Sequence, residues 1–164
     1  MPKSLEEQLG DLLKARSLTL ALAESCTGGL VANRVTDVPG ASAYFVGGVV
    51  AYAYEAKVGL LHVSWDTLRA HGAVSREAVI EMARGARMAL GADVAVSVSG
   101  IAGPGGGLPD KPVGTTWIGL STTQGDWARK FVWDGNRAQN KALSADAAFQ
   151  FLIDYLNGEV GGGD

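Results

Sequence analysis

Short apolar runs alternate with amphipathic helical patterns along most of this chain, and no other feature of the sequence constrains its fold as strongly. Leu18 to Ala23 and Val94 to Ser99 consist mainly of small and branched apolar residues, as expected of buried strands. A third run, Tyr44 to Tyr54, is rich in valine and aromatic residues and predicts a long strand. Strands that alternate with helices are typical of α/β proteins, in which helices cover the faces of a sheet.

The helices are marked by their ends as well as by their periodicity. Ser4 followed by Glu7 has the spacing of a capping box, which predicts the start of a helix. Ser75 is suited to cap a second helix that runs to Leu90 and stops before a glycine. Two further helices are predicted to begin at Leu30 and near Asn136.

A hairpin near the C-terminus makes the predicted sheet mixed. The apolar runs Val113 to Ser121 and Trp127 to Trp133 are separated by a polar turn, which is typical of antiparallel neighbours. The segment from Tyr54 to Val63 is ambiguous. We therefore expect a single three-layer α/β/α domain over residues 1–157, with a mixed and largely parallel sheet. The glycine-rich residues 158–164 are expected to form a flexible tail.

Charge and hydropathy argue against several classes of function. The net charge is −3 and no cluster of basic residues is present, so we expect no nucleic-acid partner. The chain has no apolar run of the roughly 18 residues that a membrane-spanning helix needs, and its first residues do not resemble a signal peptide. We therefore expect a cytoplasmic protein with no membrane partner. One cysteine and two histidines predict neither a disulfide nor a metal site.

Two segments rich in glycine follow predicted strands. Glu24 to Gly29 and Ser99 to Gly107 lie where a strand gives way to a loop, which is where ligands collect in open α/β sheets. Glycine lets the backbone approach a ligand closely. The second segment matches neither the dinucleotide fingerprint nor the Walker A motif. Both segments are candidate binding loops, although ordinary tight turns have the same composition.

Ser25 has two interpretations on local sequence alone. A serine that precedes a helix is more often an N-cap than a nucleophile. The neighbouring Cys26 is a rival nucleophile that would take His62 or His71 as its base, although a small buried thiol is the commoner role. A charged residue such as Lys57 lies on the surface by default. The residues alone therefore predict a ligand-binding α/β domain and no particular reaction.

Six blocks of the sequence occur in an order and spacing that a known family shares. They are Ala23 to Gly29, Glu55 to Lys57, His71 to Ser75, Ser97 to Pro104, Lys111 to Thr115 and Gly135 to Arg137. Together they resemble the CinA C-terminal domain family, whose members are nicotinamide-nucleotide amidohydrolases. This resemblance implies hydrolysis of the carboxamide of nicotinamide mononucleotide, giving nicotinic acid mononucleotide and ammonia. Longer members carry a further N-terminal domain, so we expect only the amidohydrolase part in this chain.

The resemblance also implies which residues are catalytic. Ser25 corresponds to the nucleophile, Lys57 to its base, and Tyr52 to a tyrosine that supports the lysine. The implied reaction requires no metal and no organic cofactor. Many members have serine and asparagine where this chain has Ala53 and Tyr54.

Substrate contacts are expected from both glycine loops and from the last helix. Backbone N–H groups of the loops are candidate donors to the oxyanion and to the phosphate. Arg137 is a candidate phosphate ligand, because a guanidinium offers two donors at once, and Thr115 is expected to add a hydroxyl. The expected substrate-binding residues are Thr27, Gly28, Gly29, Gly100, Gly103, Gly105, Thr115 and Arg137.

The expected partners are a small-molecule nucleotide and further copies of the chain, because small α/β enzymes often form homo-oligomers. An alternative function belongs to a different class. The chain would then be a non-catalytic nucleotide-binding regulatory or interaction domain connected with competence or DNA damage. Release of ammonia from nicotinamide mononucleotide distinguishes the two functions.

Overall fold

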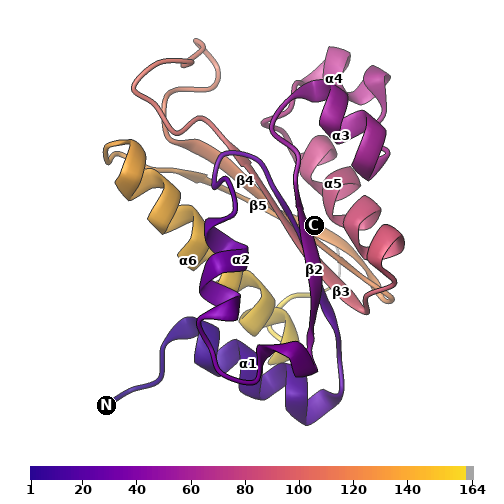
Figure 1. Ribbon diagram of the computed structural model, residues 1–164. Helices are drawn as coiled ribbons and strands as arrows, with labels where there is room; N and C mark the ends of the chain where they lie inside the picture. The colour runs from indigo at the N-terminus through magenta and orange to yellow at the C-terminus, as the bar shows by residue number, and fades with distance from the viewer. Residues whose placement is uncertain (162–164) are drawn as a thin grey trace.

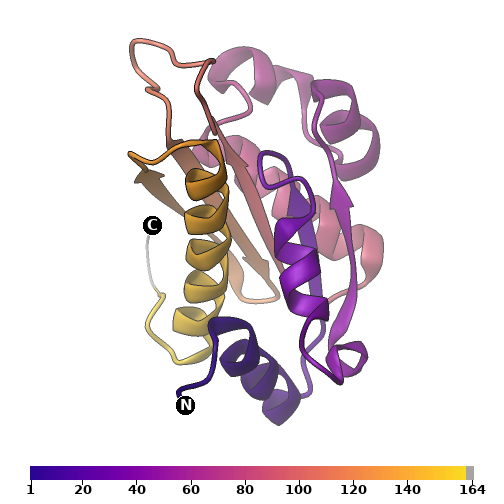
Figure 2. The same ribbon diagram turned by 60° about the vertical axis from the view of Figure 1, so that its left-hand side comes forward.

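A five-stranded sheet lies between two layers of helices in the computed structural model, which describes residues 1–161 (Figures 1 and 2). The strands are β1 (Leu20–Glu24), β2 (Phe45–Val50), β3 (Val94–Gly100), β4 (Thr115–Thr122) and β5 (Gly125–Val132). The helices are α1 (Leu5–Arg16), α2 (Leu30–Thr36), α3 (Tyr54–Leu61), α4 (Trp65–His71), α5 (Arg76–Leu90) and α6 (Arg137–Leu156). A short 3₁₀ helix, Ala41–Ala43, precedes β2.

The sheet is mixed, as the sequence predicts. Its strand order is β2-β1-β3-β4-β5. β1 pairs in parallel with both β2 and β3, whereas β4 pairs antiparallel with both β3 and β5. All strands except β4 therefore run in the same direction, and the predicted hairpin is formed by β4 and β5.

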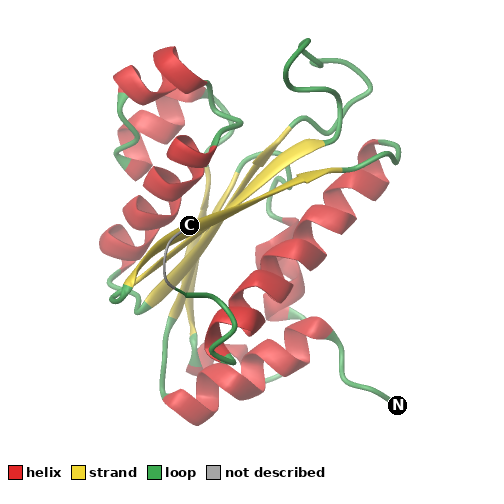
Figure 3. Cartoon of the chain, turned by 180° about the vertical axis from the view of Figure 1, so that it is seen from behind, coloured by secondary structure: helices red, strands yellow, loops and turns green. Residues whose placement is uncertain are grey.

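Each face of the sheet carries its own hydrophobic core, and Figure 3 shows the helices on both sides of the strands. One core packs α1, α2 and α6 against residues such as Leu22 and Val96. The other packs α5 and its neighbours α3 and α4 against the alternate residues, such as Ala21 and Ala95. The alternation along β1 and β3 explains why both strands read as continuous apolar runs, because each is buried on both faces.

The predicted helix starts are confirmed. Ser4 forms a capping box with Glu7, and Ser75 accepts a hydrogen bond from the Ala78 N–H at the start of α5. Asn136 forms a second capping box, with Gln139, at the start of α6. These signals are local, which is why the sequence shows them.

The predicted long strand from Tyr44 to Tyr54 is wrong at its end. β2 stops at Val50, and Tyr54 is instead the first residue of α3. Ala51 is the last residue here that pairs with β1, through a hydrogen bond from its N–H to the Glu24 carbonyl. The chain then turns into α3, and the Lys57 amine of that helix binds the carbonyl oxygens of residues 51 and 52.

Near the C-terminus, Val160 packs against the core of α1, α2 and α6. Residues 162–164 of the predicted tail lie outside the described residues, and flexibility of residues 158–164 stays a prediction. No helix within residues 1–161 has the length and apolar character to cross a membrane.

Candidate active site

Both glycine loops leave the sheet at the same end. β1 and β3 are parallel neighbours, and Ser25, the first residue after β1, donates its N–H to the Val98 carbonyl of β3 at 3.0 Å. Figure 1 shows the long loop after β3 at the same end of the sheet as α3 and α4. This end, at the carboxyl ends of parallel strands, is where α/β proteins bind ligands.

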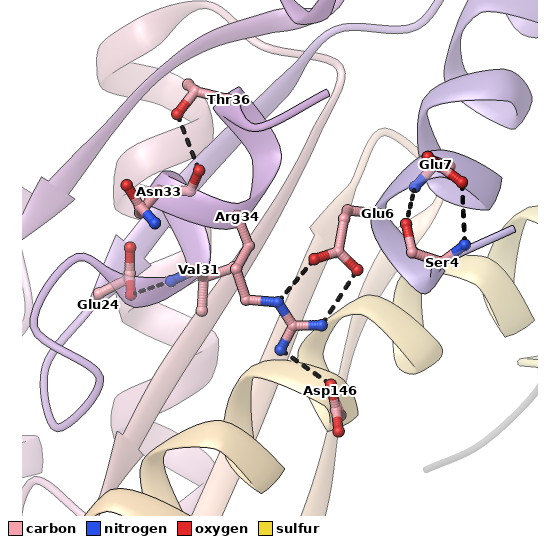
Figure 4. A network of polar contacts seen from close by, with 9 residues as sticks. All are labelled: Ser4, Glu6, Glu7, Glu24, Val31, Asn33, Arg34, Thr36 and Asp146. Atoms are coloured by element: carbon pink, nitrogen blue, oxygen red, sulfur yellow. Dashed lines mark hydrogen bonds and ion pairs between the residues drawn. The ribbon is translucent and has the colours of Figure 1, made fainter. Parts of the chain in front are cut away.

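The buried carboxylate of Glu24 fixes the first loop. It accepts hydrogen bonds from the Thr27 hydroxyl at 2.6 Å and from the N–H groups of Val31 and Ala32 at 2.9 Å (Figure 4 shows the contact with Val31). It also accepts from the Gly29 N–H at 3.2 Å. A carboxylate is favourable at the first turn of α2 because the helix N-terminus leaves N–H groups unpaired. Glu24 therefore ties the loop to the start of this helix.

Ser25 is not a helix cap. The N-cap of α2 is Gly29, which has a φ of 106°, and Glu24 takes the N–H groups that a capping side chain would take. Gly28 has a φ of 61°, so two successive residues adopt the left-handed conformation that favours glycine. The loop thereby turns into α2 without using the Ser25 hydroxyl.

The Ser25 hydroxyl faces the amine of Lys57. Lys57 Nζ lies 2.9 Å from Ser25 Oγ, and also 2.9 Å from each of the backbone carbonyl oxygens of Ala51 and Tyr52. The Lys57 side chain comes from α3 and only 1% of the residue is exposed. The structure thus brings together the serine and the lysine that are 32 residues apart in the sequence.

Burial sets the protonation state of Lys57. Removal from water disfavours the ammonium form and lowers the pKa of the amine to about 8. The carbonyl oxygens of Ala51 and Tyr52 can only accept hydrogen bonds, so they hold two N–H bonds of the amine. In the neutral amine, the remaining tetrahedral position is a lone pair directed at Ser25 Oγ. This arrangement can accept the proton of the serine hydroxyl.

The Cys26 alternative has no such partner. Burial raises the pKa of the Cys26 thiol to about 11, so the thiolate is scarce at neutral pH. Neither of its proposed bases is placed to help. His71 Nδ1 lies 3.7 Å from a Glu77 carboxylate oxygen, and His62 lines a different cavity, between α3 and α5. The structure does not support a Cys/His pair.

A cavity of about 300 Å³ opens in front of the serine and the lysine. Its lining includes Ser25, Lys57, Ser99, Gly100, Gly106 and Lys111. Among the described residues, the lining has two charged side chains, Lys57 and Lys111, and no aspartate or glutamate. The cavity therefore favours a ligand that carries negative charge.

Tyr52 lines the cavity together with Ser25, whereas Arg137, which contacts Tyr52, is not part of the lining. The Tyr52 carbonyl holds the Lys57 amine, whereas its largely exposed phenol accepts a hydrogen bond from Arg137 Nη2 at 3.2 Å. Arg137 Nη1 donates to the Gly103 carbonyl at 2.8 Å. Tyr52 thus positions the lysine through its backbone, and Arg137 ties the second glycine loop to Tyr52.

Only some of the remaining predicted substrate-binding residues face the cavity. Gly100 lines the cavity, but the Thr27 hydroxyl is bound to Glu24. Thr115 is fully buried, and its hydroxyl donates to the Pro112 carbonyl rather than toward the cavity. Gly105 has open space beside its α-carbon. The structure therefore does not bring Thr27 and Thr115 hydroxyls to a ligand.

Backbone N–H groups of the first loop that bind no other acceptor are the candidate donors to an oxyanion. The Gly28 N–H donates to the Ser25 carbonyl, and the Gly29 N–H donates to Glu24. Among the described residues, the N–H groups of Cys26 and Thr27 bind no acceptor.

Within residues 1–161, no three side chains of His, Cys, Asp or Glu are grouped so as to hold a metal ion.

Sequence reasoning assigned no role to two residues of this site. Glu24 and Lys111 each carry a charged group that is exposed by default, so no local signal shows what their side chains do. Glu24 belongs to the first candidate binding loop and to a shared sequence block, whereas only a shared block included Lys111.

The fold and the site define a mixed α/β protein with a buried serine–lysine pair in a cavity at the carboxyl ends of its parallel strands. The chain belongs to the CinA C-terminal domain family, whose sequence profile matches residues 2–156.

Relatives and solved structures agree with this assignment. The chain is 50% identical over 163 residues to a CinA-like protein of Chlorobium limicola, an alignment that covers 96% of this chain and 38% of the relative. It is similarly 48% identical over 157 residues to a CinA-like protein of Chloroherpeton thalassium, covering 93% and 37%. The chain thus spans little more than a third of the length of these relatives.

Among solved structures, the chain is similar to a competence-damaged protein (CinA) superfamily protein of Klebsiella pneumoniae. The TM-score is 0.90 with 33% sequence identity, covering 95% of this chain and 99% of that one. It is also similar to the competence/damage inducible protein CihA of Agrobacterium tumefaciens, with a TM-score of 0.88 and 36% identity, covering 96% and 98%.

Proposed function

We propose that this chain is an amidohydrolase that converts nicotinamide mononucleotide to nicotinic acid mononucleotide and ammonia. The observation that carries the proposal is the buried Lys57 amine, 2.9 Å from Ser25 Oγ and held by two carbonyl oxygens. A serine hydroxyl needs a base to become a nucleophile, and a lysine serves as one only when its pKa is lowered. The short distance between Lys57 Nζ and Ser25 Oγ and the lowered pKa of the Lys57 amine support this proposal.

The first step is attack on the carboxamide. Ser25 Oγ forms a bond to the carboxamide carbon while its proton passes to the neutral Lys57 amine. The carbonyl oxygen gains negative charge, for which the unbonded N–H groups of Cys26, a residue of the cavity lining, and of its neighbour Thr27 are the candidate donors. One such donor typically contributes about 3 kcal/mol to transition-state stabilisation.

The second step releases ammonia. The C–N bond breaks, and the Lys57 ammonium returns its proton to the leaving nitrogen, which departs as ammonia and leaves an ester on Ser25. Water then attacks the ester carbon and gives one proton to Lys57. The Ser25–acyl bond breaks, Ser25 Oγ recovers the proton, and the acid product leaves. Every proton in these steps is carried by Ser25, Lys57 or water.

The cavity suits a mononucleotide in size and charge. A volume of about 300 Å³ is at the small end of ligand cavities. Residues 1–161 contribute no acidic side chain to its lining, which favours a phosphorylated substrate over a cationic or neutral one.

The test is release of ammonia from nicotinamide mononucleotide. The purified chain should produce ammonia and nicotinic acid mononucleotide in equal amounts, with no added metal or cofactor. Ser25→Ala, prepared in the same way, is the control for a contaminating amidase. Equal rates for the two proteins between pH 6 and pH 9 would refute the proposal.

A further inference from the structure

The cavity wall carries one cation that the serine–lysine chemistry does not use. Besides Lys57, which is buried and acts as a neutral amine in the proposed reaction, Lys111 is the only charged side chain that residues 1–161 contribute to the lining. Its acidic neighbour in sequence, Asp110, instead lines an adjoining cavity that Lys111 also borders. Lys111 therefore gives this cavity its positive charge.

The Lys111 amine is held but not neutralised. It donates a hydrogen bond to the His71 carbonyl oxygen, a neutral acceptor, and it forms no ion pair with any described residue. Its backbone is fixed by two hydrogen bonds with Leu108, of 2.8 and 3.1 Å, at the tip of the glycine loop. An ammonium group has three donors, so two remain for a ligand.

A second donor lies beside this amine. A Cβ atom at Gly72 would lie 3.2 Å from Lys111 Nζ and 4.0 Å from the Tyr54 hydroxyl, so both groups flank the same glycine. Gly72 has a φ of 76°, where a side chain would be strained, and its missing side chain leaves the space between the two groups open. Tyr54 precedes Lys57 by three residues on α3, which places both on one face of that helix.

Arg137 is less suited to the same task. It is not part of the cavity lining, and its guanidinium already donates to the Gly103 carbonyl and to the Tyr52 hydroxyl. An anion bound there would have to compete with both acceptors.

We propose that Lys111 and Tyr54 form an anion-binding corner of the Ser25 cavity that recognises the phosphate of a phosphorylated pyridine nucleotide. This inference rests on the proposed amidohydrolase function. It assigns substrate preference to the corner: the nucleotide is preferred over the nucleoside because only the nucleotide presents a phosphate to Lys111. The Tyr54 hydroxyl adds a neutral donor to the same anion.

The test compares nicotinamide mononucleotide with nicotinamide riboside. Lys111→Met should lower kcat/KM for the nucleotide about 10- to 100-fold, mainly through KM, because it removes a charge-assisted hydrogen bond. The same variant should leave kcat/KM for the riboside within about twofold, since the riboside has no phosphate. Lys111→Arg should keep most of the preference for the nucleotide, and Tyr54→Phe should reduce it about two- to tenfold.

Lys14→Met is the matched control. It makes the same change of charge on the exposed surface of α1, at the opposite end of the sheet, and should alter neither substrate's kinetics (Figure 1). Equal losses on both substrates with Lys111→Met, or no loss on either, would overturn the inference. Circular dichroism of each variant confirms that the fold is retained.

Direct binding separates this inference from the proposed reaction. In the Ser25→Ala background, titration calorimetry with nicotinamide mononucleotide should show about 10- to 100-fold weaker binding when Lys111→Met is added. Wild-type protein that releases no ammonia, yet binds the nucleotide in a Lys111-dependent way, refutes the reaction and supports the corner. Ammonia release with Lys111-independent binding refutes the corner and supports the reaction.

Discussion

At the scale of single residues, two backbone carbonyls decide what the Lys57 amine can do. A lysine beside a carboxylate would be held in its charged form, but the acceptors of Lys57 other than Ser25 are the neutral carbonyl oxygens of residues 51 and 52. They orient the amine but do not offset the cost in free energy of removing a charged ammonium group from water. The result is an amine whose pKa of about 8 is close to neutral pH.

Replacement of Lys57 separates a base from a fixed charge. Lys57→Arg keeps the positive charge but cannot release its proton, so it should lose about 10²- to 10⁴-fold in kcat, as should Lys57→Met. Steady-state ammonia release by the two variants is the measurement. An arginine variant with more than a tenth of the wild-type kcat would show that Lys57 acts through its charge.

The pH profile tests the same amine without a mutation. In the proposed reaction the neutral amine is the active form, and the pKa of Lys57 is about 8, so kcat/KM should rise about tenfold per pH unit below pH 7 and level off above pH 8. Activity that is constant from pH 6 to pH 9 would contradict a base with this pKa. Initial rates at low substrate concentration in constant-ionic-strength buffers provide the profile.

Replacement of Ser25 and of its neighbour Cys26 should have very different effects on the rate of ammonia release. Ser25→Ala should abolish ammonia release, whereas Cys26→Ala should retain activity within about threefold, because a thiol with a pKa of about 11 is almost entirely protonated. Both variants are assayed side by side after their fold is checked by circular dichroism. An inactive, folded Cys26→Ala protein would move the nucleophile to the thiol.

At the scale of elements, the position of α3 depends on one glycine of α5. A Cβ atom at Gly85 would lie 1.8 Å from the carbonyl oxygen of Leu61, the last residue of α3. The two helices can approach this closely only because residue 85 has no side chain. Since α3 carries Lys57, we expect this contact to influence the distance between the Lys57 amine and Ser25.

Gly85→Ala should therefore push α3 away. Alanine normally stabilises a helix relative to glycine by about 1 kcal/mol, but the overlap with backbone atoms here should cost about 1–3 kcal/mol of unfolding free energy. A shift of Lys57 by about 1 Å should also lower kcat about 100-fold. Urea unfolding and ammonia release measure the two effects.

Gly59→Ala is the matched control on α3 itself. No atom of residues 1–161 lies within 4 Å of a Cβ at this exposed position, so the substitution should raise stability by up to about 1 kcal/mol and leave kcat unchanged. Equal behaviour of the two alanine variants would show that the contact at Gly85 does not position α3.

Elements with local signals could be predicted from the sequence, whereas elements that depend on distant partners could not. The caps Ser4, Ser75 and Asn136 predict their helices because each bonds within its own first turn. α3 has no such signal: its N-cap, Ala53, makes no side-chain hydrogen bond, and its buried face includes a lysine. A buried charge breaks the apolar periodicity on which helix prediction depends.

The site follows the same rule. Resemblance pointed to Ser25 and Lys57, which the structure places together, but nothing local predicts that Lys57 is buried. The hydroxyls of Thr27 and Thr115 look available in the sequence and are taken by Glu24 and by the Pro112 carbonyl in the structure. Which polar group is free is a property of the assembled loops and not of the sequence around it.

At the scale of the whole molecule, one arginine joins the three helices that cover a face of the sheet. Arg34 of α2 forms two hydrogen bonds with Glu6 of α1, of 2.8 and 3.1 Å, and an ion pair with Asp146 of α6 at 2.8 Å (Figure 4). Its guanidinium also lies 4.8 Å from the centre of the Phe149 ring. The side chains of Arg34 and Glu6 are 20% and 14% exposed, so solvent only partly screens this pair.

The last prediction concerns the pH dependence of stability. The hydrogen bonds from Arg34 lower the pKa of Glu6 below its ordinary value of 4.5. A lowered folded-state pKa adds stability that is fully present above the unfolded-state pKa and is lost as the pH falls through the folded-state pKa. Arg34→Met should therefore cost about 1–2 kcal/mol of unfolding free energy at pH 6, and this difference from wild type should shrink as the pH falls to 3.

Urea unfolding of both proteins at pH 6 and pH 3 measures that difference, with Arg69→Met as the control. Arg69 pairs with Asp66 at 3.4 Å, but both side chains are largely exposed, so water screens the pair and the variant should match wild type at both pH values. Methionine at position 34 keeps much of the apolar contact with Phe149, so lost packing should contribute little. A deficit of Arg34→Met that is the same at pH 3 as at pH 6 would mean that packing, and not the charge on Glu6, holds α1 and α2 together.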